Sequence, residues 1–274
     1  MDLFTLESGS PAQPAIVFLH GGGGGGWMWQ RQLAALSDQF YCLAPDLPEH
    51  GQSSAVKPFS ITGSAAHIAE LIRARVPGGR AHVVGLSEGA QIGVALLSQA
   101  PEVVERAILS SALLRPMPWL SWMFTPQMAG LSYDWGLAPF KNNEGYIRLN
   151  MKHAAAVPEE FYPHFKQAFQ SYTRDSFIHA MVENQSFRLP AGLQQVQAAV
   201  LVVVGQKEYG AMRQSARDLR AALPNATARM VNLGAKASLA QEHNWNMNAP
   251  DLFNRMLRAW FTAHELPAEL LPLN

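Results

Sequence analysis

The 274-residue sequence predicts an α/β fold with a mostly parallel central sheet, flanked by helices and interrupted by a helical insertion. Short apolar runs rich in β-branched residues alternate with longer segments of helical period, which is typical of parallel strands joined by crossover helices. The apolar runs are continuous, as expected for strands that are covered on both faces. Between residues 114 and 192 this alternation stops, which indicates an insertion.

Six apolar runs are the predicted strands. They occupy residues 15–20, 40–47, 81–86, 106–112, 198–205 and 228–234. Helices are predicted around residues 27–37, 60–76, 88–99, 211–223 and 250–263. Pro101 and Pro224 follow two of these helices, and Pro250 stands where a first helical turn tolerates proline.

Residues 114–192 contain no convincing strand and are rich in aromatic residues, Met and Pro, as in "RPMPWLSWMF" and "EEFYPHFKQAF". A separately folded domain and a helical insertion over the sheet both fit this composition. The insertion is favoured because strand-like runs resume at residue 198. We therefore expect a core domain formed by residues 1–113 and 193–274, with residues 114–192 lying over it.

The composition indicates a partner that is uncharged or small. Lys plus Arg and Asp plus Glu number 21 each, so no basic surface for nucleic acid or anionic membrane is expected. The first residues lack a signal-peptide pattern, and no run approaches the ~20 apolar residues of a membrane span. A cytoplasmic protein is expected, with no prediction of its oligomeric state. Cys42, the only cysteine, excludes an intramolecular disulfide and is predicted to be buried in a strand.

Ser87 lies in the segment "GLSEG", where an apolar run meets a helix-forming stretch. Gly85, Ser87 and Gly89 form the pattern Gly-x-Ser-x-Gly. In a sharp strand-to-helix turn the serine backbone is strained by about 1–3 kcal/mol, and the neighbours two positions away must be small. Such a turn exposes the hydroxyl and directs the first helical amides toward developing negative charge. We interpret Ser87 as a nucleophile; a simple helix cap is the alternative.

A serine nucleophile needs a base and an acid that orients the base. His243 is the favoured base because it lies in a polar loop after the last predicted strand. His20 and His50 are instead predicted to fix loops by hydrogen bonds. Glu208 is the favoured acid because it follows the strongest strand and gives the chain order Ser, acid, His. An exposed charged turn is the alternative for Glu208.

The glycine run at residues 21–26 follows the first clear strand. A phosphate-binding loop would need "GKS" or "GKT", which is missing, and a dinucleotide site would need an acid such as Asp46 after the next strand. The glycines run together without the expected helix start. A loop whose amides can approach an oxyanion is therefore favoured.

These segments together resemble the α/β-hydrolase superfamily. The matching segments, in chain order, are "LHGGGGGGW", "APDLPEHGQSS", "GLSEGA", "VLVVVGQKE" and "EHNWNMNAPDLF". The resemblance implies a sheet of about seven or eight strands, a helical cap at residues 114–192, and no metal or organic cofactor. It implies Ser87 as nucleophile, Glu208 as acid and His243 as base, with the backbone N–H groups of Gly22 and Glu88 as the oxyanion hole.

Four residues depart from the family pattern. Glu208 stands where Asp is usual, and Glu88 follows the serine where an apolar residue is commoner. Glu49 and Glu242 stand where the family often has Gly. With Glu242 directly before His243, the backbone conformation of the histidine loop is not predicted to follow the family pattern. The short segment before the first predicted strand also leaves one edge strand in question.

The predicted activity is a carboxylesterase that cleaves short to medium apolar acyl or aryl esters through an acyl-enzyme. Aromatic residues are expected to line the substrate pocket, although core packing explains the same residues. The named candidates are Trp27, Trp119, Trp122, Trp135 and Trp245. A lyase, a carbon–carbon bond hydrolase or a receptor with little turnover remain alternatives on the same fold. A lyase would need a cation near the pocket, for which Lys141 and Lys236 are candidates.

Overall fold

The computed structural model describes residues 2–117 and 121–273, without the side chains of residues 121 and 122. Its centre is an eight-stranded sheet in the order β1-β3-β2-β4-β5-β6-β7-β8. The strands are β1 (Thr5–Ser8), β2 (Ala15–Leu19), β3 (Tyr41–Pro45), β4 (Ala81–Leu86), β5 (Val104–Ser110), β6 (Ala199–Gly205), β7 (Ala226–Val231) and β8 (Leu270–Pro272). The six strands from β2 to β7 run parallel, as predicted, and the two edge strands run antiparallel to their neighbours.

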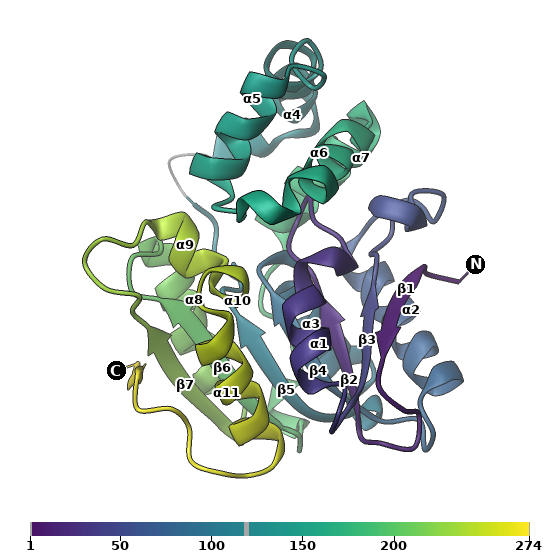
Figure 1. The fold of residues 1–274 in the computed structure, drawn as a ribbon, viewed down its shortest axis with the longest axis vertical. Helices are drawn as coiled ribbons and strands as arrows, with labels where there is room; N and C mark the ends of the chain where they lie inside the picture. The colour runs from purple at the N-terminus through teal and green to yellow at the C-terminus, as the bar shows by residue number, and fades with distance from the viewer. Residues whose placement is uncertain (1, 118–120, 274) are drawn as a thin grey trace.

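The two edge strands are the part of the sheet that the sequence did not predict. β1 pairs with β3 through only four residues, and β8 pairs with β7 through three. Both strands are short and partly exposed, so they lack the apolar run that marks the inner strands. The edge strand that the short N-terminal segment left in question is therefore present as β1, and the N- and C-termini lie at opposite edges of the sheet (Figure 1).

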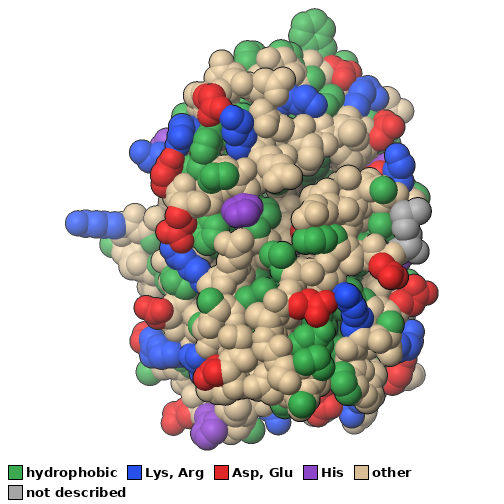
Figure 2. Space-filling model, turned by 45° about the vertical axis from the view of Figure 1, so that its right-hand side comes forward, with side chains coloured by type: hydrophobic (Ala, Val, Ile, Leu, Met, Phe, Trp, Pro, Cys, Tyr) green, Lys and Arg blue, Asp and Glu red, His purple; other side chains and the backbone are tan. Residues whose placement is uncertain are grey.

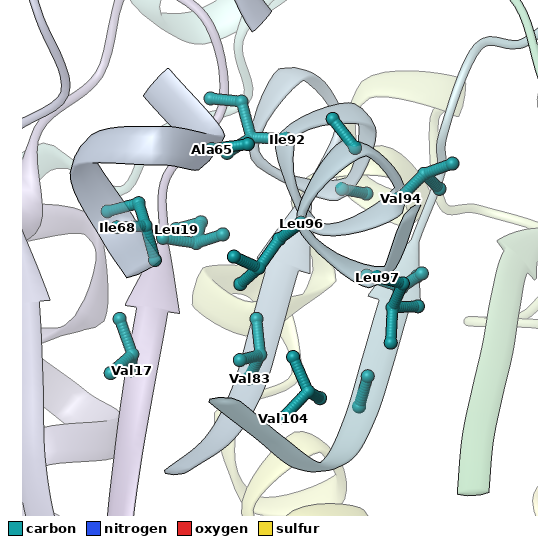
Figure 3. Close-up of a cluster of buried hydrophobic side chains, with 14 of the residues drawn as sticks. Val17, Leu19, Ala65, Ile68, Val83, Ile92, Val94, Leu96, Leu97 and Val104 are labelled. Atoms are coloured by element: carbon teal, nitrogen blue, oxygen red, sulfur yellow. The ribbon is translucent and has the colours of Figure 1, made fainter. Parts of the chain in front are cut away.

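Strands β2, β3, β4 and β6 are buried along almost their whole length, although successive side chains point to opposite faces of the sheet. Val17 and Leu19 belong to one core cluster, and Ile16 and Phe18 belong to the other. Figure 3 shows the first cluster, in which Val17, Leu19 and Val83 lie close to helix side chains such as Ile68 and Leu96. The continuous apolar runs of the sequence are thus explained by helices on each face of the sheet.

Five helices outside the insertion cover the sheet. They are α1 (Gln30–Leu36), α2 (Ile61–Arg75), α3 (Glu88–Gln99), α8 (Gly210–Ala222) and α11 (Pro250–Phe261). α1 and α11 contribute to the cluster that contains Phe18, whereas α2, α3 and α8 contribute to the one that contains Leu19. The α2 helix begins where the Ser60 side chain accepts a hydrogen bond from the Gly63 N–H, which satisfies one of its free amides.

The stretch predicted to lack strands is helical. The helices α4 (Pro126–Ser132), α5 (Glu144–Leu149), α6 (Tyr162–Ser171) and α7 (Arg174–Ser186), called here the insertion helices, lie together beyond the ends of the parallel strands (Figure 1). α7 is bound to the core, since Glu183 accepts a hydrogen bond from the Ile61 N–H at 2.8 Å and Asn184 pairs with Gln91. The exact division at residues 113 and 193 stays a prediction.

The surface carries no large region of one charge on the face seen in Figure 2, where acidic and basic side chains are interspersed. This distribution agrees with the equal numbers of the two charges in the sequence. Across residues 2–117 and 121–273, no helix combines the length and apolar character needed to cross a bilayer.

Candidate active site

Ser87 occupies the turn between β4 and α3. Its backbone angles are φ 56° and ψ −116°, a conformation with positive φ that a residue with a side chain rarely adopts. The turn is held because Ser87 N–H donates to Ser110 O at 2.8 Å and Ser87 O accepts from Ala90 N–H at 2.9 Å. The strained strand-to-helix turn predicted from "GLSEG" is therefore present, and Ser87 is partly exposed at its apex.

The two flanking glycines are required by close backbone approaches. A Cβ atom at Gly85 would lie 2.4 Å from Gly89 O, and one at Gly89 would lie 2.2 Å from Leu19 O. Real Cβ atoms do not approach a carbonyl oxygen so closely. The pattern Gly-x-Ser-x-Gly thus allows the turn to pack directly against the end of β2.

Replacing Gly89 with Ala is expected to lower the free energy of unfolding by about 2–3 kcal/mol, because the added methyl group must displace backbone. This sign is opposite to helix propensity, which would favour Ala over Gly by about 1 kcal/mol. Urea unfolding at neutral pH measures the change. Gly210→Ala is the matched control, since Gly210 begins α8 with no atom within 4 Å of the added Cβ, and its stability should not decrease. Equal stabilities of the two variants would contradict the packing argument.

The structure brings His243 and Glu208 together. His243 ends the short helix α9 (Leu239–His243), and its Nδ1 lies 2.7 Å from Glu208 Oε1. A carboxylate can only accept, so Nδ1–H is the donor, and in the neutral imidazole Nε2 then carries the lone pair. The Glu208 side chain is fully buried and also accepts from Gly205 N–H at 3.2 Å. The sequence also allowed Glu208 to lie in an exposed charged turn, but its side chain is buried in the structure.

Glu242 holds the histidine segment in place. Its carboxylate accepts hydrogen bonds from Lys207 N–H at 2.6 Å and from Leu233 N–H at 3.3 Å, and the residue is fully buried. It therefore connects α9 to the ends of β6 and β7. The departure from Gly at this position is explained by these two bonds to backbone donors, which a carboxylate satisfies well.

The glycine loop passes over Ser87. A Cβ atom at Gly21 would lie 3.5 Å from Ser87 Cβ. His20 Nδ1–H donates to Gly21 O at 2.8 Å, and His20 Nε2 accepts from Leu47 N–H at 3.0 Å. His50 Nδ1–H donates to Pro48 O at 2.9 Å and Nε2 accepts from Gly23 N–H at 3.3 Å. The prediction that these two histidines fix loops is confirmed.

Both loop histidines are uncharged. Burial lowers the pKa of His20 to about 4, and it also lowers the pKa of His50 to about 4. Neutrality is what their hydrogen bonds require, because an imidazolium cannot accept from a backbone N–H. Asp46, the residue that a dinucleotide site would need, instead accepts from Gly26 N–H at 2.7 Å and from Gln52 N–H at 2.8 Å.

A cavity of about 220 Å³ lies where these elements meet. Its wall contains Ser87 and His243, so the structure opens both predicted catalytic side chains to one space. The wall is completed by the glycine loop and by mostly apolar residues. They are Gly21, Gly22, Gly23, Gly24, Trp27, Met28, Ala154, Ala155, Val157, Phe165 and Asn244.

The predicted tryptophans separate into different places. Trp27 lines the cavity, whereas Trp245 is fully buried in the core, where its Nε1–H donates to Ser110 Oγ at 3.0 Å. Trp135 is 76% exposed and is not part of the cavity wall. Trp119 and the side chain of Trp122 lie outside the described residues. Trp135 and Trp245 are thus not brought to the site: tryptophan fits an outer surface or a core as well as a pocket.

Phe165 belongs to the aromatic-rich segment "EEFYPHFKQAF" of the insertion, but the small residues that line the cavity beside it were not predicted. Ala154, Ala155 and Val157 reach the cavity from the segment between α5 and α6. Ala154 ends a short π-helix and Ala155 and Val157 follow it, and small side chains in so short a segment carry no periodic signal. Asn244 and Met28 were also missed, although each is adjacent to a predicted site segment.

The fold and the site define an alpha/beta hydrolase. Residues 14–235 match the family model of the alpha/beta hydrolase fold, and the chain belongs to this family. An AB hydrolase superfamily protein of Gibberella zeae is 28% identical over 269 residues, which are 95% of this chain and 84% of the relative. A Pseudomonas syringae protein named "Putative carbamate hydrolase RutD" is 27% identical over 257 residues, which are 91% of this chain and 94% of the relative.

Solved structures have the same fold. A thermophilic esterase of Thermogutta terrifontis superposes with a TM-score of 0.72 at 18% identity, covering 95% of this chain and 93% of the esterase. An enol-lactonase of Burkholderia xenovorans has a TM-score of 0.71 at 22% identity, covering 95% of this chain and 96% of the lactonase. At these identities the likeness establishes the fold alone, and family membership supports hydrolase chemistry in general.

Proposed function

We propose that the protein is a serine hydrolase that cleaves carboxylic esters of short to medium apolar acyl or aryl groups. The observation that carries the proposal is the hydrogen bond from His243 Nδ1 to buried Glu208, with His243 facing the same cavity as Ser87. An oriented imidazole beside a strained, accessible serine is the arrangement that activates a hydroxyl nucleophile.

In the proposed first step, Ser87 Oγ attacks the ester carbonyl carbon while His243 Nε2 removes the hydroxyl proton. The carbonyl π electrons move to oxygen, and Glu208 stabilises the imidazolium. Collapse of this tetrahedral intermediate breaks the bond to the alkoxy oxygen, which receives the proton from Nε2. The products are the free alcohol and an acyl group on Ser87 Oγ.

In the second step, water gives a proton to His243 Nε2 and attacks the acyl carbonyl. The second tetrahedral intermediate releases the carboxylic acid and returns the proton to Ser87. The backbone N–H groups of Gly22 and Glu88 are the proposed donors to the negative oxygen in both intermediates. Their support is positional, because Gly22 lies in the cavity wall and Glu88 begins helix α3.

The cavity supports a small, uncharged acyl group. Its volume of about 220 Å³ is below the range of roughly 300–1,000 Å³ that is usual for ligand pockets. Among its described wall residues there is no Lys, Arg, Asp or Glu. A charged substrate would lose its hydration there without gaining an ion pair.

Carbamate hydrolysis is a second candidate because a relative that covers most of this chain is named for it. The same triad would serve both reactions, with an amine or alcohol leaving group. The lyase alternative has less support. Lys236 is exposed and Lys141 Nζ lies 3.5 Å from Tyr172 O, and neither is part of the cavity wall.

A substrate panel tests the proposal. We expect nitrophenyl acetate and butyrate to be cleaved with higher kcat/KM than nitrophenyl octanoate, because the cavity is small. A fluorophosphonate should label Ser87, as located by mass spectrometry of peptides, and block turnover. Matched nitrophenyl carbamates compare the second candidate in the same assay.

Three outcomes would contradict the proposal of a Ser87-dependent esterase. Faster turnover of the carbamates would favour the second candidate. Labelling of Ser87 without ester turnover would favour a lyase or a receptor. Labelling at another residue would contradict Ser87 as the nucleophile.

A further inference from the structure

The side chain of Glu88 lies beneath the glycine loop. Its backbone begins α3 directly after Ser87, and the residue is 1% exposed. A Cβ atom at Gly22 would lie 3.3 Å from Glu88 Oε2 and 3.6 Å from Oε1, so the carboxyl group packs directly against Gly22. Gly22 lines the cavity and Glu88 does not, so the Glu88 carboxyl group lies on the other side of Gly22 from the cavity.

This carboxyl group has no counter-charge. Oε1 has no hydrogen-bond partner among the described residues. The nearest basic atom is His50 Nε2 at 3.7 Å, whose lone pair accepts the Gly23 N–H, so His50 is neutral. An ionised carboxylate in this position would be a buried, unpaired charge, which proteins avoid by protonation.

The other groups that face Glu88 offer it no positive charge. Tyr172, in the connection between α6 and α7, lies against the loop, with its Oη 3.0 Å from a Cβ atom placed at Gly23. Burial and the nearby Glu88 raise the pKa of Tyr172, so it stays a neutral phenol. Glu183 on α7 adds a negative charge, and His20 stacks edge-on against His50 as a neutral ring.

We propose that Glu88 is a positioning residue of the oxyanion site, and that its carboxyl group must be uncharged for catalysis. The inference rests on the proposed function. A neutral carboxyl group fills the space beneath Gly22 without electrostatic cost. A carboxylate there would repel the negative oxygen that forms on the other side of the loop, in a site where little water screens the charge.

The proposal gives the activity an alkaline limit. Burial is the larger cause, and Glu183 the smaller one, of a Glu88 pKa raised to about 8. Above this pH the carboxyl group ionises and the rate should decrease. If only the neutral form is active, kcat/KM should fall on the order of tenfold to thirtyfold between pH 7 and pH 9.5.

The test compares pH profiles within each variant. The wild type should show the alkaline decrease, whereas in Glu88→Gln and Glu88→Met the ratio of kcat/KM at pH 7 and pH 9.5 should stay within about twofold. Glu49→Gln is the matched control, because the Glu49 side chain is also mostly buried, at 6% exposed, but it accepts hydrogen bonds from His179 Nδ1 at 2.8 Å and Phe59 N–H at 3.1 Å. It should keep the decrease. Circular dichroism at pH 9.5 verifies that each variant is folded.

Stability gives a second readout that does not need turnover. A group with a raised pKa binds its proton more tightly in the folded state, so it lowers the free energy of unfolding as pH rises from about 4.5 to about 8. The difference in stability between Glu88→Gln and wild type should therefore increase with pH over this window. Infrared detection of a protonated carboxyl band at pH 7, lost near pH 8, reports the same ionisation in the wild type alone.

The outcomes separate the two proposals. The role of Glu88 is overturned if Glu88→Gln keeps the alkaline decrease, or if the folded wild type shows no such decrease. Either result leaves the proposed hydrolase activity standing. If neither Glu88 variant folds, absence of the infrared band at pH 7 overturns it. Turnover that survives Ser87→Ala instead overturns Ser87 as the nucleophile of the proposed serine hydrolase.

Discussion

Replacing Ser87 with Ala is expected to lower kcat for nitrophenyl butyrate by at least about 10⁴-fold, because the proposed mechanism has no other nucleophile. The loss should appear in kcat rather than in KM, since the methyl group still fits the turn and the cavity wall is unchanged. The variant should also resist fluorophosphonate labelling. Steady-state kinetics with a blank for spontaneous hydrolysis measures both parameters.

Ser98→Ala is the matched control for this variant. Ser98 lies near the other end of the same helix and donates to Ala191 O at 3.2 Å, away from the cavity. Its kcat should remain within about twofold of wild type. A Ser87→Ala enzyme that keeps a tenth of the wild-type rate would mean that water or another group attacks the substrate directly.

The parts of the fold that the sequence predicted are those with a dense local signal. The inner strands β2, β3, β4 and β6 are continuous buried runs, and Pro101 and Pro224 follow the helices α3 and α8. β8 was not predicted because it has only three residues, too few to show an alternation of apolar and polar side chains, and it pairs with β7, which lies far from it in the sequence. Its existence depends on β7 offering a free edge, which is a tertiary property.

The catalytic candidates were predictable for a different reason. Ser87, Glu208 and His243 each follow a predicted strand, and parallel strands bring their carboxyl ends to one edge of the sheet. The contacts of Glu88 could not be predicted in this way. Its burial depends on Gly22, His50 and Tyr172 meeting around it from three separate segments.

Glu208→Gln is expected to lower kcat by about 10³–10⁴-fold, because an amide cannot hold the imidazole as a carboxylate does. Gln can present an N–H to His243 Nδ1, which favours the tautomer with its proton on Nε2 and removes the base. It also carries no charge to stabilise the imidazolium. The 2.7 Å bond between Nδ1 and Oε1 and the complete burial of Glu208 make this effect large, since no water replaces the lost partner.

The neighbouring Glu242→Gln variant separates catalysis from support of the histidine segment. Both carboxylates are buried, but Glu242 accepts only from backbone N–H groups of Lys207 and Leu233. Its replacement leaves one donor unpaired and should cost about 1–3 kcal/mol of stability, while kcat decreases less than tenfold. Urea unfolding and kinetics on both variants measure the contrast. If Glu242→Gln lost as much activity as Glu208→Gln, the position of the His243 ring, rather than its charge partner, would be the quantity that limits the rate.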